Sequence, residues 1–592
     1  MSQDFEKSLV LVDDLLVTDK VRFAVIKGGS NVTMQTYNAI GAGPFTNQII
    51  YNIQLPSLET VMSRHVIQTA TLLFRISGTT LAQDAAKPGS GYLFNYGGLD
   101  GFGPFPLSQL FESQTITINN TTVSQQTKSI LSILLRIHDK RVLSRYNGLT
   151  PVQFDTLAKY TKIAGSNQNP FASFLNASYD NDLLPRGSYP ITLTNVTGTN
   201  FNAAGGATIV DVAIKVSEPI LVSPFVWSEI DGESGVYGIQ ACNMTFNMSG
   251  DVGNVVRFGG VKADRFAAGA LPAVVFRGVA EPSLRIQYIT PHASTELPSR
   301  NVVSFYALDR YITSNVQGFG IGAGTEGELP KSGTVTSASI QLAQIPDKLM
   351  ITVGRPTGGR RGDEADSWLT INSINIQFNN ASGILASATQ ESLWRMAVEA
   401  GSNQSWVEFS GLAQGPPNES AAGVSSVETC GSVLMLDFAK HIQIAQEWFA
   451  PGSLGQFNLL FTVNVTNNTG IPYAAGELQL LTVVMNSGIM STQRGVSSVY
   501  TAVLAKADVL DVSREKPMGY SDAVRVVGGG KVGDFLKRNL SSLGQAALKH
   551  GAPLLLDLAK KKLGMGEAGG ASSGGKKAHR RADMGALEDR MY

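Results

Sequence analysis

The stretch ITINNTTVSQQTKSILSILLRI at residues 116–137 is repeated, in altered form, as INIQFNNASGILASATQESLWRM at residues 374–396. An Asn-Asn pair holds the same place in both copies, at Asn119-Asn120 and at Asn379-Asn380. Before the pair, apolar residues alternate with polar ones, and after a polar turn they recur every three or four positions. Alternation is typical of a half-buried strand, and the second spacing is typical of a helix. The stretch therefore predicts a unit of strand, turn and short helix that occurs twice.

Four further pairs of strand-like segments follow the same order in the two halves of the chain. They are 49–57 with 284–291, the strand ending near Gly78 with 346–358, 219–225 with 432–438, and 241–250 with 456–468. The spacing between partners drifts while their order is kept, as expected when loops of different length join a fixed framework. The repeat therefore predicts two similar domains in tandem.

Short strand-like segments separated by turn residues, with one short helix in each half, favour antiparallel β-sandwiches. Immunoglobulin-like sandwiches and jelly rolls both fit, and the number of strands and the long loops favour the jelly roll. We predict an all-β fold of two tandem antiparallel jelly-roll β-sandwiches with short inserted helices and a helical, glycine-linked C-terminal tail. The predicted parts are an N-terminal arm at 1–27, jelly roll 1 at 28–266, jelly roll 2 at 267–512 and the tail at 513–592.

The composition excludes several classes of protein. Only 16% of the 592 residues are charged and the formal net charge is zero, which does not suit a nucleic-acid clamp. Two cysteines in so long a chain predict no disulfide framework and no cysteine-based zinc site. Acidic residues near the start and short apolar runs predict no secretion signal and no membrane-spanning helix. We therefore expect a protein made in the cytoplasm, which is a reducing compartment.

The C-terminal tail differs in kind from the rest of the chain. Residues 531–592 contain twelve Lys and Arg against six Asp and Glu, and apolar residues recur there at helical spacing. A basic amphipathic helix tethered by glycine suits contact with an anionic partner, although packing against its own chain would explain it too. The candidate contact residues are Lys576, Lys577, Arg580 and Arg581.

Motifs that carry enzymatic chemistry are absent from the sequence. It contains no phosphate-binding loop, nucleophile elbow or zinc-binding helix motif, so we predict no catalytic residues, no metal and no cofactor. The turn that contains Asp363, Glu364 and Asp366 is expected to be a solvated loop of charges. Within it, Arg361, Gly362 and Asp363 form an RGD tripeptide, which a cell-surface receptor could contact if the loop is exposed; ordinary turn chemistry explains it equally well.

The long segment at 79–110 is rich in Gly, Pro and aromatic residues and lacks periodicity. A loop of this length inside a compact domain is usually functional. We expect it to be an interaction element between strands.

Several phrases resemble a known family: IPDKLMITVGR at 345–355, INIQFNNASGILAS at 374–387 and FAPGSLGQFNLLFTVNV at 449–465. With the tandem pattern over 28–512, they look like the double jelly-roll major capsid proteins of icosahedral DNA viruses, the adenovirus, tectivirus and polinton-like lineage. The resemblance implies a structural virion protein that assembles with itself as homotrimeric, pseudo-hexagonal capsomers and then with neighbouring capsomers. It also implies that the loop at 79–110 is an intersubunit clasp or an outward tower. Minor capsid proteins, an internal membrane or the genome are the partners expected for the tail.

Two alternative functions remain open on the sequence. Two β-sandwiches also suit a penton- or spike-like virion protein that binds a receptor or a glycan through loop tips. A tandem jelly-roll capsid protein of an RNA virus is the third option, and only the short run KKAHRR at 576–581 matches the basic arm that such proteins carry.

Overall fold

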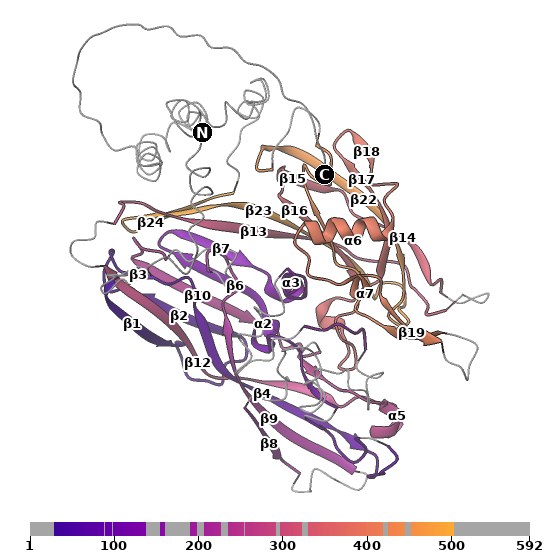
Figure 1. Cartoon of the computed structure of the whole chain (residues 1–592). Helices are drawn as coiled ribbons and strands as arrows, with labels where there is room; N and C mark the ends of the chain where they lie inside the picture. The colour runs from indigo at the N-terminus through magenta and orange to yellow at the C-terminus, as the bar shows by residue number, and fades with distance from the viewer. Residues whose placement is uncertain are drawn as a thin grey trace, which may run out of the picture. The chain divides into compact units, whose positions relative to one another are not determined.

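The computed structural model describes residues 29–87, 89–96, 99–137, 154–159, 190–197, 206–225, 235–253, 255–291, 297–322, 329–417, 424–444 and 451–501. Within them the chain forms two sandwiches of antiparallel sheets, each around its own hydrophobic core (Figure 1). The predicted N-terminal arm and C-terminal tail, with Lys576, Lys577, Arg580 and Arg581, lie outside the described residues.

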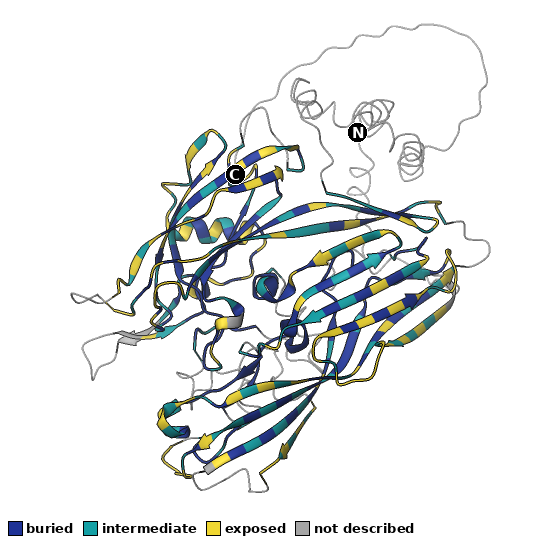
Figure 2. Cartoon of the chain, turned by 180° about the vertical axis from the view of Figure 1, so that it is seen from behind, coloured by how far each residue is buried: buried dark blue, intermediate teal, exposed yellow. Residues whose placement is uncertain are grey.

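The first jelly roll consists of two sheets that enclose one core. One sheet has the order β1 (Gly29–Asn38), β12 (Ala273–Pro291), β4 (Ile67–Thr80), β9 (Gly206–Pro219) and β8 (Ile191–Asn195), with β3 (Val61–Met62) against β12. The other has the order β2 (Gln48–Gln54), β10 (Ala241–Met248), β6 (Phe111–Ile118) and β7 (Thr121–Gln125). In β2 every second residue is buried, because one face of a strand points into the core and the other to solvent (Figure 2).

The second jelly roll repeats this arrangement. One sheet has the order β13 (Asn301–Thr313), β23 (Gln479–Gln493), β16 (Lys348–Gly354) and β21 (Leu434–Asp437), with β24 (Val496–Tyr500) against β23. The other has the order β14 (Ser332–Thr336), β22 (Leu454–Thr466), β17 (Thr370–Phe378) and β18 (Ala381–Ile384), with β15 (Ile340–Gln344) against β22. Four strands of each sheet therefore correspond in order, β1-β12-β4-β9 to β13-β23-β16-β21 and β2-β10-β6-β7 to β14-β22-β17-β18, and the all-β double jelly roll is confirmed.

Short elements complete the described part of the chain. The helices are α2 (Pro106–Leu110), α3 (Thr127–Leu134), α5 (Lys262–Arg265), α6 (Gln390–Glu399) and α7 (Trp406–Phe409), with 3-10 turns η6 (Ala267–Gly269) and η7 (Thr357–Gly359). Two small two-stranded antiparallel sheets pair β5 (Gly101–Phe102) with β11 (Val256–Arg257), and β19 (Leu412–Pro417) with β20 (Val424–Glu428). One helix follows the Asn turn in each half, as the repeat predicted.

The two Asn turns have the same structure. Asn119 and Asn379 both adopt the left-handed conformation, with φ of 52° and 51°, which Asn tolerates better than most residues. Each side-chain oxygen accepts a backbone hydrogen bond from the neighbouring segment in the sheet. Asn119 accepts from the amide of Gln240, just before β10, at 2.7 Å, and Asn379 accepts from the amide of Asn458 in β22 at 2.8 Å. The predicted duplication is therefore present, with one difference: a short strand, β7 or β18, lies between the turn and the helix.

The predicted boundary between the jelly rolls at residue 267 is too early. Strand β12 pairs with β1 and β4, so residues 273–291 belong to the first jelly roll. The match of 284–291 with 49–57 is wrong for the same reason, since the counterpart of β12 is β23. The strand predicted at 219–225 is wrongly placed. The residues that pair with β4 are those of β9, which comes just before and ends at Pro219.

The segment at 79–110 folds inward. Phe94 and Phe102 are buried in the first core, and their rings meet at 6.0 Å. Asp100 forms a two-armed ion pair with Arg265 at 2.6 Å, and both side chains are fully buried. Residues 89–96 and 99–110 are thus largely core structure and do not form the expected outward tower, whereas residues 82–87 are exposed. The role of the segment as an intersubunit clasp stays a prediction.

Candidate functional site

Residues 154–159 of the first half are inserted into the second jelly roll. Leu157 forms an antiparallel bridge with Thr429, and Lys159 forms one with Glu364. The Ala158 amide donates to the carbonyl of Glu428 at 3.1 Å. Because backbone hydrogen bonds join the two halves directly, this strap fixes one jelly roll against the other.

Arg136, two residues after the end of α3, is the centre of the junction. Its side chain has no exposed surface and donates to Asp366 Oδ2 at 2.7 Å and to the Asp155 carbonyl at 2.6 Å. Its guanidinium group lies 4.3 Å from the ring centroid of Trp368. A charge from the first half is therefore held by a carboxylate and an aromatic ring of the second.

Three further arginines extend this buried network. Arg360 shares the Asp366 carboxylate with Arg136. Arg257 pairs with Asp155 at 3.6 Å and donates to the Glu364 carbonyl.

On the outer side of the network, Arg355 bridges Glu364 at 2.6 Å and Glu477 at 3.1 Å. Four arginines thus face four carboxylates, and burial makes each pair strongly dependent on its partner.

The ionisation of Asp366 follows from this balance. Burial disfavours its charged form, but the nearby Arg136, Arg360 and Arg257 outweigh that effect and lower its pKa to about 2. The carboxylate is therefore ionised at neutral pH.

Strands β13 and β23 of the second half make a further contact with the first jelly roll. Val303 and Phe305 of β13, with Met490 of β23, are buried in the first core. At the tip, the Ser497 amide donates to Asn120 Oδ1 at 2.8 Å, and Thr121 Oγ1 donates to the Ser497 carbonyl at 2.8 Å. The second Asn of the first turn therefore has a role in holding the halves together.

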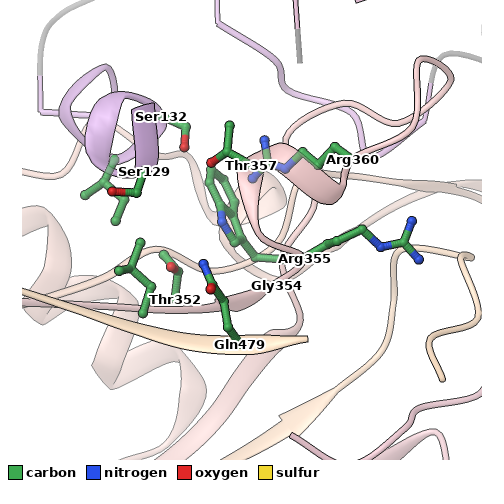
Figure 3. A pocket seen from close by; sticks show the side chains of 11 residues that line it. Ser129, Ser132, Thr352, Gly354, Arg355, Thr357, Arg360 and Gln479 are labelled. Atoms are coloured by element: carbon green, nitrogen blue, oxygen red, sulfur yellow. The ribbon is translucent and has the colours of Figure 1, made fainter. Parts of the chain in front are cut away.

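A small polar cavity lies between α3 and the strands of the second jelly roll (Figure 3). Its volume is about 10 Å³, which is room for a single water molecule. Ser129 and Ser132 of α3 lie on one side, and Thr352, Gly354 and Gln479 lie on the other. The cavity is a packing detail of the junction and is too small for a substrate.

The RGD tripeptide lies beside this junction. The Arg361 side chain is 55% exposed, but Asp363 is only 9% exposed and pairs with Lys262 at 2.5 Å. The carbonyl of Gly362 accepts a hydrogen bond from the Phe258 amide at 2.8 Å. The prediction of an exposed loop is therefore wrong for Asp363, whose carboxylate a receptor would need.

The prediction that the acidic turn is solvated is also wrong. Glu364 and Asp366 are buried and hold the arginines of the junction. The only local signal was Arg136, a lone charge inside the apolar run ILLRI. Its partner lies 230 residues away, so no pattern of spacing connects the two.

Among the described residues, no group of His, Cys, Asp and Glu is placed to hold a metal ion. Within the same ranges, no helix has the length and apolar character needed to cross a bilayer. Both cysteines, Cys242 and Cys430, are free and buried.

Two jelly rolls in one chain, locked by a buried junction, define the class of double jelly-roll capsid proteins. Comparisons with known proteins agree with this class. Residues 3–289 match the first domain of the Sputnik virophage major capsid protein, and residues 308–488 match the C-terminal domain of the major capsid protein V20. The putative capsid protein V20 of Sputnik virophage is 25% identical over an alignment 587 residues long, which covers 93% of each chain.

Two solved structures share the fold. The Sputnik virophage structure matches with a TM-score of 0.71 at 22% identity, over 87% of this chain and 97% of that one. The mavirus major capsid protein matches with a TM-score of 0.67 at 15% identity, over 86% and 96%. The chain is a double jelly-roll major capsid protein and a structural component of the virion capsid, and its two halves match domains of the Sputnik virophage major capsid protein. These similarities favour a major capsid protein over a penton- or spike-like protein and over a capsid protein of an RNA virus.

Proposed function

We propose that the chain forms homotrimers whose six jelly rolls make a pseudo-hexagonal capsomer, and that capsomers then join into an icosahedral shell. The observation that carries this proposal is the duplication itself, with both Asn turns and both sheet orders alike. Two similar blocks held at a fixed angle by buried contacts can be continued by copies of the chain into a closed ring.

The buried junction supports the proposal because it makes the pair of jelly rolls one rigid block. Arg136, Asp366 and the strap at 154–159 leave little freedom for the halves to rotate. A shell built of many weak contacts needs such rigid units, since multivalency adds small contacts only when the geometry allows them at once. The role is structural, and synthesis in the host cytoplasm precedes assembly.

The test is the oligomeric state of the purified full chain. Light scattering should give three times the chain mass of 63.0 kDa, and negative-stain images should show near-hexagonal outlines. A stable monomer or a two-fold dimer over a wide concentration range would contradict the proposal.

We propose further that the C-terminal tail contacts an anionic partner inside the shell, the genome or an internal membrane, with a minor capsid protein as the competing partner. The twelve basic residues of 531–592, among them Lys576, Lys577, Arg580 and Arg581, support this assignment. Binding to nucleic acid releases counterions, so its affinity falls steeply with salt.

The tail is tested with the full chain and a variant in which those four basic residues are glutamine. Binding of the wild type to single- and double-stranded nucleic acid and to anionic vesicles should fall as salt rises, and the variant should bind each probe more weakly. Equal binding of both proteins would remove the tail from the contact.

A further inference from the structure

The junction within one chain provides a template for a contact between chains. Helix α3 of the first half packs on the outer face of the β13–β23–β16–β21 sheet, where Ser132 and Ile133 meet Thr352 and Gly354. Three apolar side chains of the α3 segment, Ile130, Ile133 and Leu134, belong to the second core. In this place the helix of one jelly roll therefore covers the sheet of the next.

The register of the strands identifies the same place on the first jelly roll. The ladder between β4 and β12 ends at Ile67 and Arg285, and the ladder between β16 and β23 ends at Lys348 and Met485. Both ends are the first residues of the corresponding strands β4 and β16.

Counting from these ends, Thr71 and Leu73 of β4 occupy the positions of Thr352 and Gly354 of β16. On the edge strand, Thr36 pairs with Arg285 as Leu308 pairs with Met485. Asn38 therefore takes the position of Arg310, which donates to Ser129 of α3 at 2.9 Å.

This place on the first jelly roll is an open groove of about 670 Å³. It is lined by Asn38, Thr71, Leu73, Lys215, Glu281 and Arg285, among others. These include the counterparts of the residues that α3 covers in the second jelly roll. No described residue fills the groove as α3 fills its counterpart.

Helix α6 is the counterpart of α3 and has a free outer face. Leu393 and Ala397 point into its own core, as the helix spacing dictates. On the outer side, Glu391, Arg395 and Val398 form a stripe at positions i, i+4 and i+7. The side chains of Glu391 and Arg395 are 59% and 68% exposed, and Val398 is 43% exposed.

We propose that α6 of one copy docks in the groove of the first jelly roll of a second copy, as α3 does on the second jelly roll within the chain. The inference rests on the proposed homotrimer and specifies its contact surface. The chemistry is matched: the groove offers Lys215, Arg285 and Glu281 to the helix charges, and Leu73 to Val398. The contact is heterologous, with a helix on one side and a sheet on the other, and such contacts form a ring when the rotation between copies closes, as the proposed trimer requires.

Site-directed cross-linking tests this contact in the full chain. Thr71→Cys and Val398→Cys place one thiol in the groove and one on the helix. The native thiols do not compete, because Cys242 and Cys430 are both buried and burial raises the pKa of each to about 12. A short bismaleimide is added, and the products are separated under denaturing conditions.

The double variant should give covalent dimers and trimers, and a mixture of the two single variants should give dimers only. Each single variant alone should stay uncross-linked, as should the control pair of Thr71→Cys with Val261→Cys, since Val261 is similarly exposed at 50%. Circular dichroism confirms that the variants are folded. Trimers by light scattering without cross-linking of the double variant would overturn this docking and leave the proposed trimer intact. Cross-linking of Val398→Cys to itself would show a two-fold contact and also overturn it, whereas a wild type that stays monomeric contradicts the trimer itself.

Discussion

Replacing Asp366 with asparagine tests whether the buried junction holds the two jelly rolls together. The carboxylate takes a hydrogen bond from Arg136 at 2.7 Å and is shared with Arg360. The substitution keeps the shape of the side chain but leaves two buried guanidinium groups without the charge that they share. Breaking a buried ion pair by removing one partner costs about 3–5 kcal/mol.

The pKa of Asp366 provides an independent magnitude. Its fall from 3.8 to about 2 on folding corresponds to roughly 2–3 kcal/mol of stability. Because the folded pKa is the lower one, this stability is present above the unfolded pKa and is lost as pH falls through the folded pKa. Both routes lead to a loss of a few kcal/mol, a large share of a total of about 5–15 kcal/mol.

The assay is urea unfolding at pH 7, followed by tryptophan fluorescence, with Trp368 beside Arg136 as a natural reporter. The control is Lys440→Gln, which breaks the exposed Lys440–Glu399 pair of 2.9 Å and should cost less than about 0.5 kcal/mol. The difference between wild type and Asp366→Asn should be constant from about pH 5 to 7 and shrink below about pH 4. If Asp366→Asn unfolds at the same urea concentration as the control, the junction does not stabilise the fold as argued.

Three further predictions concern single positions. Burial raises the pKa of Glu218 to about 7, so the stability that its protonated form contributes is full below the unfolded pKa of 4.5 and is lost as pH rises through 7. The melting temperature of the wild type should therefore fall more between pH 5 and 8 than that of Glu218→Gln. An equal fall of both melting temperatures with pH would contradict this. Gly431 and Gly383 both have positive φ, but a Cβ at Gly431 would lie 2.0 Å from the Trp368 carbonyl oxygen, whereas nothing lies within 4 Å at Gly383. Gly431→Ala should therefore lower the melting temperature far more than Gly383→Ala, which costs about 1–2 kcal/mol of backbone strain. Asn119→Ala and Asn379→Ala should each destabilise the chain by about 1–2 kcal/mol, and Asn→Gly at either site by less, because glycine keeps the left-handed conformation; a loss at only one site would show that the two turns are not equivalent.

The part of the fold that the sequence predicts is the part encoded locally. The Asn turns are visible because a left-handed residue between an alternating strand and a short helix depends on neighbours in the chain. The strand β12 was assigned to the wrong half because its partners β1 and β4 lie about two hundred residues before it. Residues 284–291 look like any half-buried strand that ends at proline, and nothing local says which sheet receives them.

The same limit explains the candidate site. A cluster of Asp363, Glu364 and Asp366 is indistinguishable in sequence from a solvated turn. Two of its partners come from the other jelly roll, since Arg136 pairs with Asp366 and Lys262 pairs with Asp363. Likewise the aromatic segment at 79–110 has no periodicity because it fills the core as a loop, where side chains point inward at irregular intervals. Long-range pairing, rather than local propensity, decides both cases.

The outward faces of α3 and α6 differ in polarity for a physical reason. The outward residues of α3, Ile130 and Ile133, never meet water after folding, because both jelly rolls belong to one chain and the partner sheet is always present. The outward residues of α6, Glu391 and Arg395, meet water until another copy arrives, and an apolar stripe there would promote non-specific association before assembly. Covalent linkage thus permits outward positions of a helix to be apolar where the partner sheet is guaranteed, as at Ile130 and Ile133 of α3. Where the partner has to be found by diffusion, the chain uses a polar face, whose contacts are weak singly and add up around a closed ring.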